Sequence, residues 1–462
     1  MSSKVKVTVN GKVMLLHRGS LLSDALDIEK PCGGHGKCGK CKVLVNGVEE
    51  LACRYTVDSD IEVRTFDAGD IVSETGLVGG GEPCGRLCLA LDVGTTTLAL
   101  ALVSLDERRV QRVITSTNPQ RAYGADVITR IEYCQKNPHS VLHDVLVGEI
   151  NRMIRELGVS VETMYVAANV TMLHTLFDVD CTSIGVAPYT PAFLESKRES
   201  AEAVGIKGVK EVVSLPSISS FVGADIVAGL GFLGMPEDGK YNLLVDLGTN
   251  AEVALYSSRS GLATAAAAGP CFEGANISCG MSATAGAVYS FRLDYGHADC
   301  KTIGDCEPKG ICGTGLIDTV CELLKNGIID ETGYMEDDYE IAKGVYLAPE
   351  DVRQYQLAKS AVCSAILSLM RTEGIGFEDI SKMYISGGFS AKINVSNAAS
   401  SGLFPRELAA RTEAINNSSL QGTVRYACEG TDLERFVELI RYVDLGSSQF
   451  FNELFIENMM FE

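Results

Sequence analysis

Residues 86–105 read RLCLALDVGTTTLALALVSL, and residues 241–258 read YNLLVDLGTNAEVALYSS. Each stretch is an apolar strand that ends at an aspartate, Asp92 or Asp246, followed by a Gly-Thr turn and a second apolar strand. Chance does not readily place two such copies in one chain, each between apolar strands. The repeat therefore predicts two related lobes within this chain.

The two Gly-Thr turns suit the binding of phosphate. A tight glycine turn at a strand end presents backbone amides and hydroxyl groups, which hold phosphate oxygens without much positive charge. Each aspartate is placed to hold Mg²⁺, directly or through water. We therefore predict that Asp92 and Asp246 are catalytic. The turn residues predicted to bind the cofactor are Gly94, Thr95, Thr96, Thr97, Gly248, Thr249 and Asn250.

Three further glycine-rich segments follow. The strand MYIS at 383–386 runs into Gly387 and Gly388, where missing side chains allow a flat base to approach. The other two read GPCFEGANISCGM at 269–281 and GICGTGLIDTV at 310–320. For each residue of these two loops taken singly, an ordinary turn leading into a helix is an equally good interpretation. The candidates taken from them are Glu273, Gly313, Gly315 and Asp318.

Residues 31–57, PCGGHGKCGKCKVLVNGVEELACRYTV, contain four cysteines. Cys32, Cys38 and Cys41 have C-x5-C-x2-C spacing, and Cys53 follows later in the segment. Four thiolates are what two bridged irons require, so we predict a [2Fe–2S] cluster here. A structural zinc site is the alternative, because C-x2-C also occurs there. We favour the cluster because three ligands in one glycine-rich loop after a hairpin resemble a ferredoxin.

Composition narrows the possible functions of the 462-residue chain. A formal net charge of −20 argues against a nucleic-acid or anionic-membrane surface, because phosphate contacts require clustered Lys and Arg. We expect a cytoplasmic protein, since no apolar run reaches the ~20 residues of a membrane span and no secretory signal pattern is visible. Its 16 cysteines are then expected to be thiols or metal ligands. Residues 67–86 include three consecutive glycines and predict a flexible linker.

Together, the repeated turns and the SGG turn resemble those of the actin, sugar kinase and heat-shock-protein ATPase superfamily. This resemblance implies ATP with Mg²⁺, an adenosine loop at Gly387 and Gly388, and a two-lobed ribonuclease H-like fold. It also implies that Glu273 approaches the nucleotide as a third catalytic residue and that Gly313 and Gly315 bind the cofactor. The expected fold class is α+β and α/β. The expected units are a β-grasp ferredoxin-like domain (1–66), the linker (67–86), a first lobe (87–238) and a second lobe with the adenosine loop (239–462).

The whole arrangement resembles the reductive activators of corrinoid proteins. The likeness extends through NPQRAYGADVITRI, NVTMLHTLFDVD, APYTPAF, SFVGADIVAGL and GICGTGLID, and covers nearly the whole chain. It implies an ATP-hydrolysing iron–sulfur reductase that passes one electron from its [2Fe–2S] cluster to an inactive Co(II) corrinoid (cobalamin-binding) protein of a methyltransferase system. The product is the Co(I) state that accepts methyl groups. Reduced ferredoxin or another low-potential donor is the implied electron source, and a homodimer is left open.

Two other functions stay open at this point. One is an ATP-dependent electron donor for a different metalloenzyme, and the other is a small-molecule kinase with a fused ferredoxin domain. The kinase alternative leaves the four-cysteine loop unexplained. The chain also departs from the family pattern at Ser390, where a glycine is expected after the adenosine turn, and this departure bears on nucleotide affinity.

Overall fold

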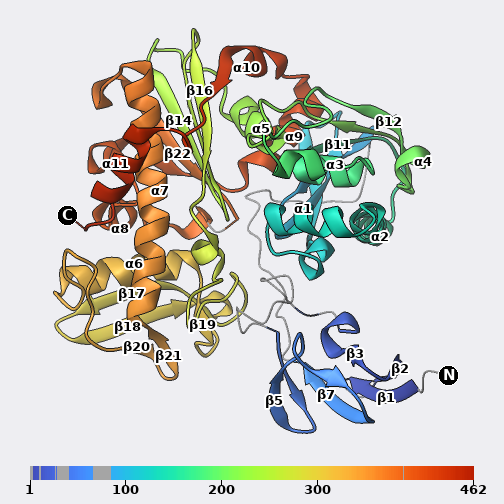
Figure 1. The fold of residues 1–462 in the computed structure, drawn as a ribbon. Coiled ribbons are helices and arrows are strands. Elements are labelled where there is room, and N and C mark those ends of the chain that lie inside the picture. Colours follow the sequence, from blue (N-terminus) through green and yellow to red (C-terminus); the bar gives the residue numbers. More distant parts are fainter. Residues whose placement is uncertain are drawn as a thin grey trace.

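The computed structural model describes residues 4–9, 12–26, 28, 41–65, 85–388 and 390–461. These residues form a small N-terminal sheet and two larger lobes, and Figure 1 shows the two lobes packed against each other through α5 (Ala224–Leu233), α9 (Ser418–Glu429) and α10 (Glu434–Leu439). No helix within these ranges is both long and apolar enough to cross a membrane. The fold is mixed α/β, as the sequence predicts.

The N-terminal sheet has the strand order β2-β1-β7-β4-β5. Strands β1 and β7 pair in parallel at its centre, and antiparallel partners flank them. Val7, Val43 and Val63 are fully buried beneath it, because alternate side chains of a strand point to the same face. The elements are β1 (Lys4–Val9), β2 (Lys12–His17), β3 (Ser20–Leu21), η1 (Leu22–Asp24), β4 (Lys42–Val45), β5 (Val48–Leu51), β6 (Thr56–Val57) and β7 (Ile61–Thr65).

The first lobe is built on a six-stranded sheet of order β10-β9-β8-β11-β13-β12. Strand β8 is antiparallel to β9 and parallel to β11. Its sequence LCLALDV is nearly continuous in apolar residues because both faces are covered. The strands are β8 (Leu87–Val93), β9 (Thr97–Ser104), β10 (Arg109–Thr117), β11 (Val161–Ala168), β12 (Arg198–Ser200) and β13 (Val209–Ser214). The helices are η2 (Pro119–Ala122), α1 (Val127–Lys136), α2 (Ser140–Leu157), α3 (Val170–Leu176), η3 (Thr182–Gly185), α4 (Ala201–Val204) and α5 (Ala224–Leu233).

The second lobe repeats this pattern in its own six-stranded sheet, of order β23-β22-β14-β15-β16-β24. Strand β14 is antiparallel to β15 and parallel to β22, as β8 is to β9 and β11. The strands around the two repeated turns are therefore arranged alike in the two lobes. The strands of this sheet are β14 (Tyr241–Leu247), β15 (Ala251–Tyr256), β16 (Gly261–Ala266), β22 (Ile380–Ser386), β23 (Thr412–Ala414) and β24 (Ile440–Tyr442).

Further elements complete the second lobe around helix α7. The apolar spacing of residues 354–370 predicts a core helix, and α7 confirms it because most of its residues are buried. The strands are β17 (Ala287–Asp294), β18 (His297–Thr302), β19 (Gly310–Ile311), β20 (Tyr339–Ala342) and β21 (Val345–Leu347). The helices and helical turns are η4 (Pro270–Glu273), η5 (Ile303–Asp305), α6 (Gly313–Lys325), α7 (Pro349–Glu373), η6 (Phe377–Asp379), η7 (Ser390–Lys392), α8 (Val395–Ser400), η8 (Arg406–Arg411), α9 (Ser418–Glu429), α10 (Glu434–Leu439) and α11 (Gln449–Glu457).

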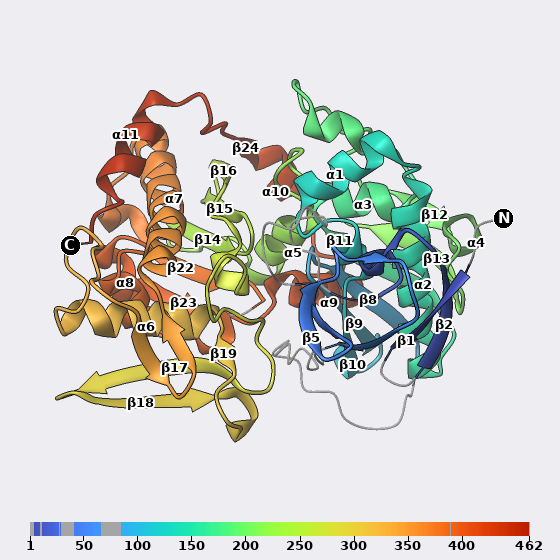
Figure 2. The same ribbon diagram turned by 60° about the horizontal axis from the view of Figure 1, so that its bottom comes forward.

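Helix α9 connects the lobes in a way that residue order does not indicate. It lies in the segment that the sequence assigned to the second lobe, yet it packs on β8 and β11 of the first and along α5. Its Leu420 and Val424 join a buried cluster with Ala90 and Ala99 of the first sheet. Figures 1 and 2 both show α5 and α9 side by side between the two sheets. The chain thus returns to the first lobe, and this return contributes residues to the site described next.

Candidate functional site

A cavity of about 230 Å³ lies between the lobes and is lined by both repeated turns. The structure therefore brings together side chains that are distant in sequence. Most of the predicted site residues line this cavity: Asp92, Gly94, Thr95, Thr96, Thr97, Asp246, Gly248, Thr249, Asn250, Glu273, Gly313, Gly387 and Gly388.

The first turn joins β8 to β9. The Gly94 N–H donates to the Thr97 carbonyl over 3.0 Å, and a Cβ at Gly94 would lie only 2.7 Å from that oxygen. Only glycine fits this close approach without a shift. Asn118 Nδ2 donates to the Gly94 carbonyl over 2.8 Å, and Asn169 Nδ2 donates to Thr95 Oγ1 over 3.2 Å. These bonds fix the turn at the cavity wall.

The second turn is one residue shorter than the first. Here the Gly248 N–H donates to the Asn250 carbonyl over 2.9 Å. The shorter turn changes which residues face each other across the hairpin: Asp92 is opposite Ala99, but Asp246 is opposite Glu252. The second lobe therefore adds a carboxyl group to the cavity at the place where the first lobe has a methyl group.

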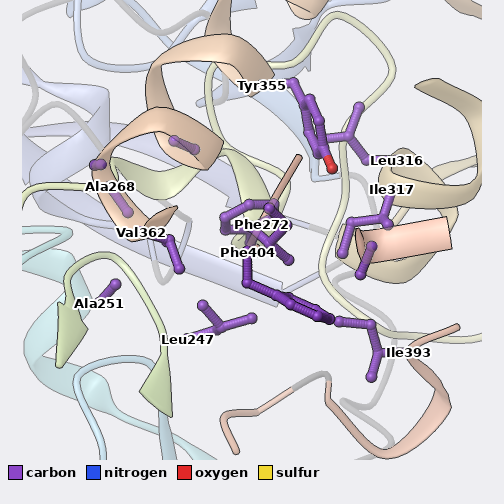
Figure 3. Packing of buried hydrophobic residues seen from close by; sticks show 14 of the residues in the cluster. Leu247, Ala251, Ala268, Phe272, Leu316, Ile317, Tyr355, Val362, Ile393 and Phe404 are labelled. Carbon is purple, nitrogen blue, oxygen red and sulfur yellow. The ribbon is translucent and has the colours of Figure 1, made fainter. Parts of the chain in front are cut away.

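Glu273 links the two turns. Its Oε2 accepts hydrogen bonds from Thr96 Oγ1 of the first lobe, at 3.1 Å, and from Thr249 Oγ1 of the second, at 3.0 Å. Figure 3 shows the preceding residue, Phe272, among the buried side chains of the second lobe. The ring of Phe272 meets that of Tyr355 edge to face, with centroids 6.0 Å apart. This packing anchors η4, so the carboxylate of Glu273 is held in position.

Helix α9 supplies the partners of Asp92. Asn417 Nδ2, from the N-cap of α9, donates to the carboxylate over 2.8 Å, and Ser419 Oγ donates over 2.7 Å. Burial raises the pKa of Asp92, and these two hydrogen bonds offset part of the shift. Asn417 and Ser419 lie 325 and 327 residues after Asp92 in the sequence, and they position its carboxylate.

Four partly buried carboxyl groups line the cavity together: Asp92, Asp225, Asp246 and Glu252. Burial, and then the charges of Asp246 and Asp92, raise the pKa of Asp225 to about 7. Burial and the charge of Asp92 raise the pKa of Asp246 to about 6. Burial followed by the charges of Asp225 and Asp246 raises the pKa of Glu252 well above its usual value. Crowded carboxyl groups of this kind resist ionisation until a cation is supplied.

The carboxyl groups surround the cavity instead of converging on one point. In the described part of the chain, no three His, Cys, Asp or Glu side chains are arranged to hold a metal ion by themselves. Mg²⁺ is usually held by one or two carboxylates together with water and substrate phosphates, and not by an all-protein cage. The donor set therefore fits a cation that arrives with a phosphate ligand.

Two of the predicted residues lie away from the cavity lining. Gly315 packs in α6 against β17, where an added Cβ would lie 2.0 Å from the Val288 carbonyl oxygen. The carboxylate of Asp318 accepts a hydrogen bond from Asn397 Nδ2 at 2.8 Å and is buried in the second lobe. Close packing against β17 explains why residue 315 is a glycine, in agreement with the alternative that residues 310–320 are an ordinary turn leading into a helix.

The two glycines of the predicted adenosine turn also differ in their surroundings. Gly387 has φ +128°, and a Cβ there would lie 2.2 Å from the Leu247 carbonyl oxygen, so this glycine lets the turn pack on β14. An added Cβ at Gly388 would meet nothing within 4 Å. The unexpected Ser390 is buried, and its hydroxyl donates to the carbonyls of Gly387 and Ile415, at 2.9 and 2.7 Å. Ser390 therefore secures the turn without facing the cavity.

Two of the four predicted cluster cysteines lie within the described residues. The β4–β5 hairpin pairs Lys42 with Leu51, which places Cys41 beside the turn that carries Cys53. Both sulfurs are buried, 3.1 Å apart, and no disulfide joins them. Cys32 and Cys38 lie outside the described residues, as does nearly all of the predicted linker.

Sequence reasoning did not identify Asp225, Glu252, Asn417 or Ser419. A signal existed for Glu252, because it is a charged residue in the otherwise apolar strand AEVALY and such strands rarely bury a charge without a functional reason. Asn417 carries an N-cap signature for α9. The approach of that cap to Asp92 has no counterpart in local sequence.

Comparison with known proteins agrees with this geometry. Residues 87–238 match the RACo middle region, and residues 240–462 match the C-terminal domain of RACo, the ASKHA domain. The corrinoid activation enzyme RamQ of Eubacterium limosum is 27% identical over 81% of this chain and 70% of its own length. The [Co(II) methylated amine-specific corrinoid protein] reductase of Methanosarcina barkeri is 25% identical over 80% of this chain and 76% of its own.

A solved structure shares the fold. The reductive activator for corrinoid, iron-sulfur protein superposes with a TM-score of 0.74 at 23% identity, covering 99% of this chain and 98% of the other. Together the two domain matches span nearly all of the chain after residue 86. The chain belongs to the family of reductive activators of corrinoid proteins.

Proposed function

We propose that this protein uses ATP to drive the one-electron reduction of a Co(II) corrinoid protein to Co(I), with the electron held by a [2Fe–2S] cluster in its N-terminal unit. The observation that carries the proposal is one cavity to which both lobes contribute a phosphate-type turn, in a chain that also places two buried thiols 3.1 Å apart. The names of the two curated relatives support the corrinoid protein as the substrate.

The cavity supports ATP as its ligand. Both turns offer backbone amides and hydroxyl groups, the groups that hold phosphate oxygens. Asp92 and Asp246 are the residues that would hold Mg²⁺, and the remaining ligands would come from water and the phosphate groups. Supplying this cation would also allow the crowded carboxyl groups to ionise. The base would lie against Gly388, where the wall has no side chain.

The N-terminal unit fits an iron–sulfur cluster. Its sheet joins two hairpins through a central parallel pair, and its hairpin β4–β5 brings Cys41 and Cys53 together as two buried thiols. Thiolates are the ligands that such clusters require, and Cys32 and Cys38 would complete the set. When bound, the cluster would supply single electrons at low potential.

The two lobes supply the coupling to ATP. Co(I) is a stronger reductant than a ferredoxin-type cluster, so direct transfer is uphill. Nucleotide can shift this equilibrium only by binding two conformations with different affinity. Glu273 is bonded to a threonine of each lobe, so a ligand that displaces these contacts changes how the lobes are held together. We assign the two conformations to different separations of the lobes.

The test mixes the chemically reduced protein with Co(II) corrinoid proteins, with and without Mg-ATP, and follows the visible spectrum. We expect the Co(I) band only with Mg-ATP. The variant Cys53→Ser should lose the cluster absorption and the Co(I) band while it binds Mg-ATP as before, because its cavity is unchanged. Cys428→Ser, a half-buried thiol on α9, is the matched control and should behave as wild type.

Two outcomes would contradict the proposal. One is the absence of a Co(I) band with every corrinoid protein tried. The other is full activity of Cys53→Ser, which would place the electron elsewhere. Loss of both the cluster and ATP binding in that variant would instead show that the N-terminal unit and the lobes are not independent.

A further inference from the structure

Arg130 of α1 is a fully buried guanidinium directly behind the first phosphate turn. Its Nη2 donates to the Thr95 carbonyl over 2.5 Å, and its Nε donates to the Gly124 carbonyl over 2.9 Å. Its Nη1 contacts Gln120 Oε1 at 3.3 Å and Met172 Sδ at 3.1 Å. One side chain therefore ties the turn to three neighbouring segments.

All of these partners are neutral. Asp126 and Glu273 act on Arg130 only at longer range, while burial and the charge of Arg121 lower its pKa to about 9. A buried cation without a bonded anion carries a large desolvation cost. Packing alone does not explain a guanidinium at this position, because an apolar side chain of similar size would avoid the cost.

The charges that line the cavity suggest a role for the positive charge of Arg130. Among the described residues that line it, there is no Lys or Arg. Six are acidic: Asp92, Asp126, Asp225, Asp246, Glu252 and Glu273. A polyphosphate that binds in this cavity would be repelled by these acidic side chains. Arg130 supplies a positive charge one peptide group behind the cavity surface.

The orientation of one peptide group completes the argument. The carbonyl of Thr95 points at Arg130, and a trans peptide directs the following N–H to the opposite side. The N–H of Thr96 therefore points away from Arg130, and it has no acceptor within the described parts of the chain. Both threonines line the cavity.

We infer that Arg130 is a positioning residue for the phosphate groups of the nucleotide: it holds and polarises the Thr95–Thr96 peptide so that its N–H donates to a phosphate oxygen. This inference rests on the proposed binding of ATP. It assigns to the first turn a positive potential that the turn's own side chains do not supply.

The test compares binding of Mg-ATP, tripolyphosphate and adenosine by calorimetry. Arg130→Lys keeps the charge but cannot reach all the acceptors, since an ammonium lacks the planar fork. Gln120→Glu keeps the fork and places a negative charge against it. Both variants should bind Mg-ATP and tripolyphosphate about tenfold more weakly, the effect of one lost charge-assisted hydrogen bond. Adenosine affinity should stay within about twofold of wild type.

A matched control is available in Arg411, whose guanidinium donates to the backbone carbonyls of Phe377 and Ile380 and does not line the cavity. Arg411→Lys should leave all three affinities unchanged. Hydrogen–deuterium exchange of the peptide at 92–98 should be faster in Arg130→Lys than in either the wild type or this control.

Three results decide between the possibilities. Unchanged tripolyphosphate affinity in both Arg130→Lys and Gln120→Glu would overturn the inference. Equal loss of adenosine and tripolyphosphate binding would also overturn it, because that pattern marks general damage to the fold. Failure of the wild type to bind Mg-ATP would refute the proposed function itself, so the two failures are distinguishable.

Discussion

Replacing Asp246 with asparagine tests how much the crowded carboxyl groups of the cavity destabilise the folded protein. Asparagine has nearly the same shape as a protonated aspartate but cannot ionise. Burial and the charge of Asp92 raise the pKa of Asp246 from 3.8 to about 6. The folded protein therefore favours the neutral form of this side chain, and the unfolded chain does not.

The magnitude follows from this shift. Since the folded pKa is the higher one, the stability associated with the neutral carboxyl is fully present below about pH 3.8 and is lost as the pH rises through about 6. A shift of about two pKa units corresponds to about 3 kcal/mol once both states are ionised. Asp246→Asn should therefore raise the free energy of unfolding by up to about 3 kcal/mol at about pH 8, and by less than about 1 kcal/mol at about pH 4.

The assay is thermal unfolding of the wild type and variant in a chelating buffer at these two pH values. Asp238→Asn is the control, because Asp238 is exposed and its pKa is lowered by the Ser381 hydroxyl and the Lys240 N–H. Its replacement should not stabilise the protein at either pH. The same Asp246 variant should lose ATP hydrolysis under the proposed function, so stability and activity would change in opposite directions.

Either of two results would refute this reasoning. Asp246→Asn could be less stable than wild type at about pH 8, which would mean that the carboxylate is stabilised by partners other than those described. Alternatively, the effect of the substitution could be independent of pH, which would mean that the pKa of Asp246 is the same in the folded and the unfolded protein.

Two further variants test the link between the lobes. Glu273→Gln weakens the two hydrogen bonds from threonine hydroxyls, so ATP hydrolysis should fall about ten- to hundredfold in a steady-state assay, and unchanged turnover would count against a bridging role. Gly422→Ala would place a methyl group 1.8 Å from the Ala228 carbonyl oxygen, so calorimetry should show a loss of about 1–3 kcal/mol from separation of α5 and α9. Gly148→Ala on α2, where the added methyl meets nothing within 4 Å, should be neutral or slightly stabilising, and equal effects of the two alanines would exclude the packing explanation.

The sequence was sufficient to predict a structural element wherever a single short segment contains all the residues that form it. The repeat around Asp92 and Asp246 predicts a strand, a tight turn and a second strand, and these form because apolar runs and a glycine turn require nothing distant. The β4–β5 hairpin likewise brings Cys41 and Cys53 together over a short stretch of chain. The core position of α7 follows from the spacing of its apolar residues.

The features of the site that the sequence did not predict depend on contacts between segments that are distant in the chain. Gly315 has the surroundings of a loop residue in sequence, yet it lies in helix α6, where its backbone closely approaches Val288 of strand β17. Asn417 reaches Asp92 only because α9 crosses back to the first sheet. Glu252 enters the cavity because the second turn is one residue shorter, which changes the cross-strand partner of Asp246.

The sequence by itself determined the two repeated strand–turn–strand units, their Gly-Thr turns and the four-cysteine segment, since periodicity, glycine turns and ligand spacing are local properties. Only the tertiary structure decided how these parts act on one another. It placed Glu273 between Thr96 and Thr249, and it set Arg130 behind the first turn. The physical reason is that charge and hydrogen bonding depend on distance in space, and the chain contacts that set those distances are formed only when the lobes pack.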